Sequence, residues 1–153
     1  MKRVCSVLGL GLVLSFFFLA CDAGKNETPN ATAVSSHHSK TLHWSSDWDG
    51  ALREAKAENK LVIVDFYAGW CIWCKKLEET TLSDRAVMAF LDEHFVPLRL
   101  DVDHKGRELS REFRVDGLPT ILIVNAQGQE VGRIPGFLPP AAFLKRVQGF
   151  VGS

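Results

Sequence analysis

The 153-residue chain has no excess of either charge, few cysteines and no internal repeats. Its 18 Lys and Arg residues equal its 18 Asp and Glu residues, which argues against a nucleic-acid-binding surface and against an acidic disordered tail. Four cysteines are too few for a disulfide-dense scaffold. The length allows one domain of ordinary size. The cysteines stand in different sequence contexts, at Cys5, Cys21, Cys71 and Cys74.

The start of the chain predicts export. Lys2 and Arg3 precede an uncharged run rich in Leu and Phe over residues 4–20. Such a run is at the lower limit for crossing a hydrocarbon core of ~30 Å. The basic start, the short apolar run and the small residue at its end favour a signal peptide over residues 1–20 rather than a permanent membrane span.

Cys21 directly follows this apolar run, and residues 18–21 (Phe-Leu-Ala-Cys) resemble the cleavage box of bacterial lipoproteins. The Phe and Leu depart from the commonest form of that box. The resemblance implies cleavage before Cys21 and a diacylglyceryl group on that cysteine. Two or three acyl chains suffice for stable anchoring in a membrane. An ordinary signal peptide with a chance cysteine is the alternative. Asp22 resembles a signal for retention in the inner membrane.

Residues 21–40 contain almost no large apolar side chain, which predicts a flexible tether carrying the lipidated cysteine. Roughly 20 flexible residues span about 25 Å, enough to hold a domain just off a membrane.

From residue 41 onward helical and strand patterns alternate, and we expect one domain over residues 41–153. Apolar, β-branched runs predict strands at residues 61–67, 95–102, 120–125 and 130–134. Apolar residues at helical spacing predict helices that begin at Ser46, near Cys71, at Ser83, around Leu109 and at Pro139. With a short first strand at residues 41–44, this order predicts an α/β fold with a mixed, four- to five-stranded central sheet flanked by helices.

The reactive side chains are concentrated in the segment Trp70-Cys71-Ile72-Trp73-Cys74. Two cysteines at this spacing can close a small disulfide ring. Because Cys71 should lie at a helix N-terminus, free N–H groups and the helix dipole would lower the pKa of its thiol. We therefore expect Cys71 to be the nucleophile and Cys74 the resolving thiol, exchanging disulfides through a mixed-disulfide intermediate.

The same Cys-x-x-Cys pair is also half of a structural zinc site. The folded region offers only His94 and His104, singly, as further ligands, which favours redox chemistry. A metal-handling lipoprotein that uses Cys71, Cys74 and the tail histidines (His37, His38 and His43) is the alternative from a different class. We expect no metal and no cofactor other than the Cys71–Cys74 disulfide.

The whole predicted domain resembles the thioredoxin superfamily, and three segments carry the resemblance. Residues 64–75 resemble its strand–loop–helix active site, Gly117-Leu-Pro-Thr its cis-proline loop, and Gly136-Phe137 its glycine–aromatic step after the hairpin. The phrases Asp65-Phe-Tyr-Ala-Gly-Trp-Cys and Thr81-Leu-Ser-Asp are most similar to the C-terminal periplasmic domain of the DsbD family of membrane reductases. The Ile-Trp dipeptide between the cysteines is a departure, and this sequence contains no multi-span membrane domain of the DsbD kind.

The resemblance implies a thioredoxin fold and gives Asp65 a role. Asp65 lies in a strand that should be buried, and burial raises the pKa of a carboxyl group. It would accept the Cys74 proton as the mixed disulfide resolves. A structural pair with Arg99 on the neighbouring strand is the alternative.

The resemblance also gives roles to residues around the cysteines. Pro119 would be cis and pack against Cys71, and the backbone of Leu118 would pair with a substrate strand. Trp70 is expected to pack beside the disulfide. Ile72 and Trp73 lie between the cysteines and are candidate substrate contacts, with simple packing as the alternative for Trp73.

The sequence thus predicts a membrane-anchored, periplasm-facing thiol-disulfide oxidoreductase of the bacterial cell envelope. We favour a reductant or electron relay, although known pairs span about −270 to −120 mV. A disulfide oxidase or isomerase and a non-catalytic adaptor are the alternatives. The expected partners are envelope protein thiols and disulfides, a membrane electron donor of the DsbD type, and the membrane itself through Cys21. We expect a monomer that does not bind nucleic acid.

Overall fold

The computed structural model describes residues 42–151, so the predicted signal peptide, Cys21 and the tether lie outside the described residues. The strands are β1 (Leu61–Tyr67), β2 (Phe95–Asp101), β3 (Thr120–Val124) and β4 (Glu130–Pro135). The helices are α1 (Trp48–Glu58), α2 (Ile72–Lys76), α3 (Arg85–His94), α4 (Arg107–Glu112) and α5 (Pro140–Gln148), and a π-helical turn, η1 (Leu77–Leu82), follows α2. No helix within residues 42–151 has the length and apolar character needed to cross a bilayer.

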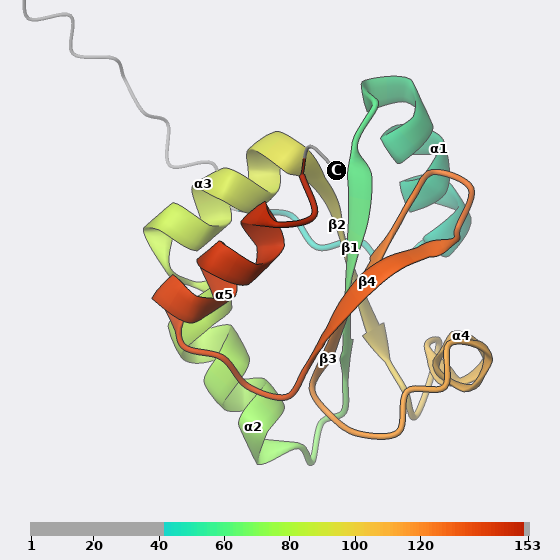
Figure 1. Ribbon diagram of the computed structural model, residues 1–153. Coiled ribbons are helices and arrows are strands. Elements are labelled where there is room, and N and C mark those ends of the chain that lie inside the picture. Colours follow the sequence, from blue (N-terminus) through green and yellow to red (C-terminus); the bar gives the residue numbers. More distant parts are fainter. Residues whose placement is uncertain (1–41, 152–153) are drawn as a thin grey trace, which may run out of the picture. The chain divides into compact units, whose positions relative to one another are not determined.

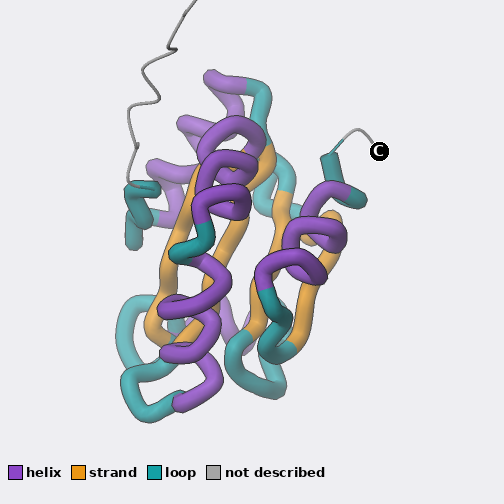
Figure 2. The backbone as a smooth tube through the Cα atoms, turned by 90° about the vertical axis from the view of Figure 1, so that its left-hand side faces the viewer, coloured by secondary structure: helices purple, strands orange, loops and turns teal. Residues whose placement is uncertain are grey.

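The strands form one mixed sheet in the order β2-β1-β3-β4. β1 runs parallel to β2 and antiparallel to β3, and β3 and β4 form an antiparallel hairpin. Helices α2, α3 and α5 cover one face of the sheet, and α1 and α4 lie on the other (Figure 1). Figure 2 shows the first of these helical layers from its outer side. The predicted α/β fold is confirmed with four strands, while the suggested first strand is reduced to an isolated parallel bridge between Ser45 and Leu98.

The alternation of β1 decides which helices its side chains meet. Val62, Val64 and Phe66 are buried in the cluster shared with α1. Ile63 points to the other face, into the cluster formed with α3 and α5. Successive side chains of a strand point to opposite faces, so Asp65 shares the side of Ile63 and lies under the layer that contains α2.

Two helix starts lie one residue later than the sequence suggested. The N-cap of α1 is Asp47, not Ser46, and its side chain accepts a hydrogen bond from the Gly50 N–H. The N-cap of α3 is Asp84, not Ser83, and it accepts from two backbone N–H groups. At each site a serine directly precedes the aspartate, and both residue types are good N-caps, so the sequence alone does not decide between them.

The helical chain after Cys71 continues from α2 into η1 through Thr80 and Thr81, although threonine is a poor helix former. In η1 the threonine hydroxyls donate hydrogen bonds to backbone carbonyls. Thr80 Oγ1 donates to the Lys76 carbonyl, and the buried Thr81 Oγ1 donates to the Leu138 carbonyl, each at 2.7 Å. These bonds let β-branched, polar residues remain in a helical turn. The continuous helix places Glu78 one turn beyond Cys74.

Candidate active site

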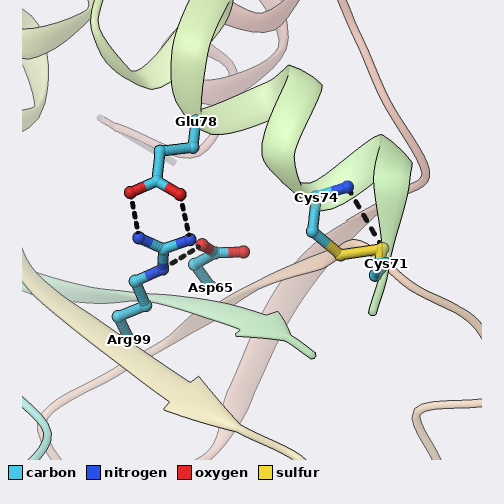
Figure 3. A network of polar contacts seen from close by, with 5 residues as sticks. All are labelled: Asp65, Cys71, Cys74, Glu78 and Arg99. Atoms are coloured by element: carbon cyan, nitrogen blue, oxygen red, sulfur yellow. Dashed lines mark hydrogen bonds and ion pairs between the residues drawn. A yellow bond between two sulfur atoms is a disulfide. The ribbon is translucent and has the colours of Figure 1, made fainter. Parts of the chain in front are cut away.

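The two cysteines lie where the chain leaves the carboxyl end of β1 and enters α2. Cys71 is the N-cap residue of α2 and forms a disulfide with Cys74, with the Cα atoms 5.3 Å apart. The backbone N–H of Cys74 donates to Cys71 Sγ at 3.1 Å (Figure 3). A backbone N–H directed at this sulfur, at the start of a helix, stabilises negative charge on it once the disulfide is reduced.

The loop before β3 packs against this disulfide. The Leu118–Pro119 peptide bond is cis, and Leu118 packs on the cluster formed by Ala68 and the two cysteines. Thr120 Oγ1 closes the loop by donating to the Gly117 carbonyl at 2.8 Å. The Gly136 N–H donates to the Pro119 carbonyl at 2.8 Å, and its φ of +75° explains the glycine after the hairpin.

Three large apolar side chains around the buried disulfide are exposed. Trp70 is 73% exposed, Ile72 74% and Trp73 53%. Trp70 does not pack beside the disulfide as expected, since its indole N–H donates to Asp103 Oδ2 at 2.9 Å and holds the ring at the surface. Exposed apolar groups gathered around a reactive bond are typical of a surface that meets other proteins.

Trp73 is exposed and also packed. Its ring centroid lies 5.8 Å from that of Phe137, and Lys76 Nζ lies 5.0 Å from each of the two centroids. This cation–π arrangement holds Trp73 in one orientation while leaving half of its surface free.

Asp65 lies beneath α2 and is 2% exposed. Its register partner on β2 is Arg99, whose Nε lies 3.1 Å from Asp65 Oδ2. The other end of the Arg99 guanidinium binds both carboxylate oxygens of Glu78. The ion pair with Arg99 that the sequence offered as an alternative is therefore present, and Arg99 is shared between two carboxylates.

The second oxygen of Asp65 is available for chemistry. Asp65 Oδ1 is buried and has no hydrogen-bond partner within residues 42–151. It points away from Arg99 toward the helix that carries Cys74 (Figure 3). Burial raises the pKa of Asp65 to about 7, against the lowering effect of Arg99 and with a smaller raising effect of Glu78. Such a carboxyl can both take and release a proton at neutral pH.

Three side chains near the site were not predicted from the sequence. Glu78 stands four residues after Cys74, a spacing that places both on one helix face and would have revealed it. Asp103 follows β2, and the carboxyl ends of the parallel strands β1 and β2 meet at the same edge, which brings it near Trp70. Tyr67 ends β1, and its ring centroid lies 4.2 Å from the Arg99 guanidinium carbon.

The arrangement is that of a redox disulfide rather than a structural one. The disulfide joins residues only three apart, so it constrains little of the chain. Within residues 42–151, no three His, Cys, Asp or Glu side chains gather in a way that would hold a metal ion. With the sheet order and the cis-proline loop, the site defines a thiol-disulfide oxidoreductase of the thioredoxin fold.

Comparison with known proteins gives the family. The sequence profile of the thioredoxin-like domain matches residues 48–150, and the chain belongs to this family. The thiol:disulfide interchange protein DsbD of Vibrio cholerae is 43% identical over 104 residues, which are 65% of this chain and 17% of that protein. The chain thus spans about a sixth of the length of the curated relatives it matches.

Solved structures of proteins with the same fold are similar to this chain. A thioredoxin from Thermus thermophilus superposes with a TM-score of 0.64 and 34% identity, covering 71% of this chain and 87% of its own. The oxidised C-terminal domain of DsbD from Neisseria meningitidis gives a TM-score of 0.60 and 26% identity, covering 70% and 98%.

Proposed function

We propose that the protein is a membrane-anchored reductant or electron relay of the cell envelope, acting through Cys71 and Cys74. The observation that carries the proposal is the buried Asp65 carboxyl, whose unpartnered oxygen points toward the helix that bears Cys74. The similarity to DsbD supports the same direction and an exported location. A membrane donor of the DsbD type and envelope protein disulfides are the proposed partners.

The reaction begins from the reduced pair. The Cys71 thiolate attacks one sulfur of a partner disulfide, forming a mixed disulfide, and the other partner sulfur leaves as a thiolate that takes up a proton. Cys74 then gives its proton to Asp65 and attacks Cys71 Sγ. The second partner sulfur leaves and is protonated. The partner gains two electrons and two protons, and the Cys71–Cys74 disulfide seen in the structure is formed.

The surroundings of the pair have proposed binding roles. The exposed side chains of Trp70, Ile72 and Trp73 contact the partner. The Leu118 backbone, held in the loop by the cis bond to Pro119, pairs with an extended partner segment. A donor dithiol then attacks the Cys71–Cys74 disulfide and returns the pair to the reduced state.

The N-terminal segment would attach this chemistry to a membrane. We propose that residues 1–20 are removed, that Cys21 is acylated and that residues 22–40 form the tether, with Asp22 favouring the inner membrane. Incorporation of labelled palmitate should occur in the natural protein and be lost in Cys21→Ser. Label retained in that variant would contradict this assignment.

Two measurements test the redox proposal. The reduction potential should lie nearer to about −270 mV than to about −120 mV, and a value at the upper end would support the oxidase alternative. In cells, Cys74→Ser should trap partners as mixed disulfides, because the resolving thiol is gone. Cys71→Ser is the matched control and should trap none. Equal trapping by both variants would contradict the assignment of Cys71 as the nucleophile.

A further inference from the structure

A polar groove adjoins the disulfide on the side of α4. Its volume is about 370 Å³, and its rim includes Trp70 and Leu118, two of the proposed partner contacts. The charged side chains that line it are Arg107, Arg111, Asp103 and Asp116. A partner segment lying along the cis-proline loop would pass over this groove.

The short helix α4 separates its charges between two faces. Its sequence is Arg-Glu-Leu-Ser-Arg-Glu over residues 107–112. Arg107 and Arg111, four residues apart, both line the groove, whereas Glu108 and Glu112 do not. The α4 wall of the groove is therefore cationic, although the helix as a whole is neutral.

The guanidinium groups of Arg107 and Arg111 differ in the hydrogen bonds and ion pairs that they make. Arg107 donates to the Asp103 carbonyl at 2.6 Å, which fixes its side chain along the wall. The exposed Arg111 side chain has no ion pair or hydrogen bond within residues 42–151. Of the two carboxylates that line the groove, that of Asp103 accepts the Trp70 indole N–H, and Asp116 also lines the neighbouring groove that contains Arg133. The α4 wall thus retains a free cation that faces the position of a partner.

We propose that this groove recognises an acidic side chain close to the reacting cysteine of a polypeptide partner. The inference rests on the proposed function and adds a substrate class to it. A guanidinium group binds a carboxylate through two parallel hydrogen bonds, and Arg111 has its donors available for this. Arg107 adds positive potential along the same wall, and Arg111 acts as a specificity residue.

The test uses three disulfide peptides that differ only in Glu, Gln or Lys two residues from one cysteine. The full-length protein is mixed with each peptide in the presence of a dithiol that returns the Cys71–Cys74 disulfide to the reduced state, and kcat/KM is measured after the direct reaction of the dithiol with the peptide is subtracted. The value of kcat/KM for the Glu peptide should exceed that for the Gln peptide by about fivefold and that for the Lys peptide by more. This preference should shrink in high salt. The change should lie in KM rather than in kcat.

Variants identify the residue responsible. Arg111→Glu should reverse the order of the three peptides, because the Arg111 side chain makes no hydrogen bond or ion pair within residues 42–151 and the substitution reverses its charge. The matched control is Lys56→Glu, on α1 near the start of β1 and thus at the opposite end of the sheet, and it should preserve the order. Preference for the Glu peptide surviving in Arg111→Glu would overturn the proposal.

The outcomes separate this inference from the proposed function. Equal reduction of all three peptides would overturn the acidic preference and leave the reductant assignment standing. Failure to reduce any peptide would contradict the reductant assignment itself. Glutathione disulfide, a small disulfide that also carries carboxylates, is a further arm. If it were reduced faster than the Glu peptide with the same dependence on Arg111, the polypeptide part of the proposal would be overturned.

Discussion

Arg99 and Arg133 lie on β2 and β4, the two outer strands of the sheet, and each guanidinium binds both carboxylate oxygens of one glutamate. Each lowers the pKa of its glutamate, chiefly through those hydrogen bonds. The pairs differ in what else the arginine touches. Arg99 also contacts the buried Asp65, whereas Arg133 donates to the carbonyls of Phe113 and Arg114.

The difference shows that one ion-pair chemistry can serve two purposes. At Arg99 a second, buried carboxylate, that of Asp65, shares the cation, so the ion pair affects a group that can take and release protons. At Arg133 the remaining donors hold the loop after α4, which leads toward the cis-proline. Surface ion pairs alone contribute little to stability, so the neighbours of each arginine decide its importance.

The largest effect should come from removing the buried carboxyl. Asp65→Asn deletes the proposed proton acceptor, and we expect resolution of the mixed disulfide at pH 7 to slow by about 100-fold. In the natural protein this step should accelerate as pH rises through about 7, where Asp65 ionises, and the variant should lose that dependence. Quenched single-turnover reduction of a disulfide peptide measures it, and an unchanged rate would contradict the role.

Asp65→Asn should slow the chemistry but stabilise the fold. The pKa of Asp65 is raised to about 7 in the fold, so ionisation opposes folding: the cost is absent below about pH 4, grows as pH rises and is complete above 7. Asp65→Asn should therefore raise the free energy of unfolding at pH 8 by about 2–4 kcal/mol, and by less at pH 5. Urea denaturation at both pH values measures the difference.

Substitution of the two groups beside Asp65 should shift its pKa in opposite directions. Arg99→Gln removes the cation that lowers the pKa, and the midpoint of the pH–rate profile should rise by about one unit. Glu78→Gln removes an anion that raises the pKa, and the midpoint should fall by about half a unit. Shifts of the same sign in both variants would show that the shared guanidinium does not control this carboxyl.

The smallest effect is expected on the other outer strand. Arg133→Gln removes hydrogen bonds to two loop carbonyls and should lower the free energy of unfolding by about 1 kcal/mol. The midpoint of the pH–rate profile should stay unchanged. Glu130→Gln, which leaves those carbonyl contacts in place, is the matched control and should cost less. A shifted midpoint in Arg133→Gln would remove the contrast between the two arginines.

The parts of the fold that could be predicted are those with strong local signals. The β-branched runs identified four strands, and the Cys-x-x-Cys spacing with a following helix placed Cys71 at an N-terminus. The caps at Asp47 and Asp84 were each missed by one residue, because adjacent polar residues compete and the choice depends on backbone geometry. The π-helical turn was missed because the threonine hydroxyls are satisfied by carbonyls, one of them on a distant loop.

The parts of the site that could not be predicted depend on contacts between separate elements. Glu78 reaches Arg99 because the helix continues from α2 into η1, and Arg99 lies on β2, a separate element. Trp70 is held at the surface by Asp103, a residue 33 positions away, so its own surroundings in the sequence suggested packing instead. Pattern analysis finds reactive groups, whereas the partners that tune them come from the sheet topology.

The bridge at Ser45 has a consequence for contacts between copies of the domain. The N–H of Ser45 donates to the Pro97 carbonyl, and its carbonyl accepts the Arg99 N–H, so this segment covers the outer side of β2. Pro97 itself has no N–H to offer. An uncovered outer strand is a template for edge-to-edge β-aggregation, so this covering would hinder pairing between the β2 strands of two copies of the domain.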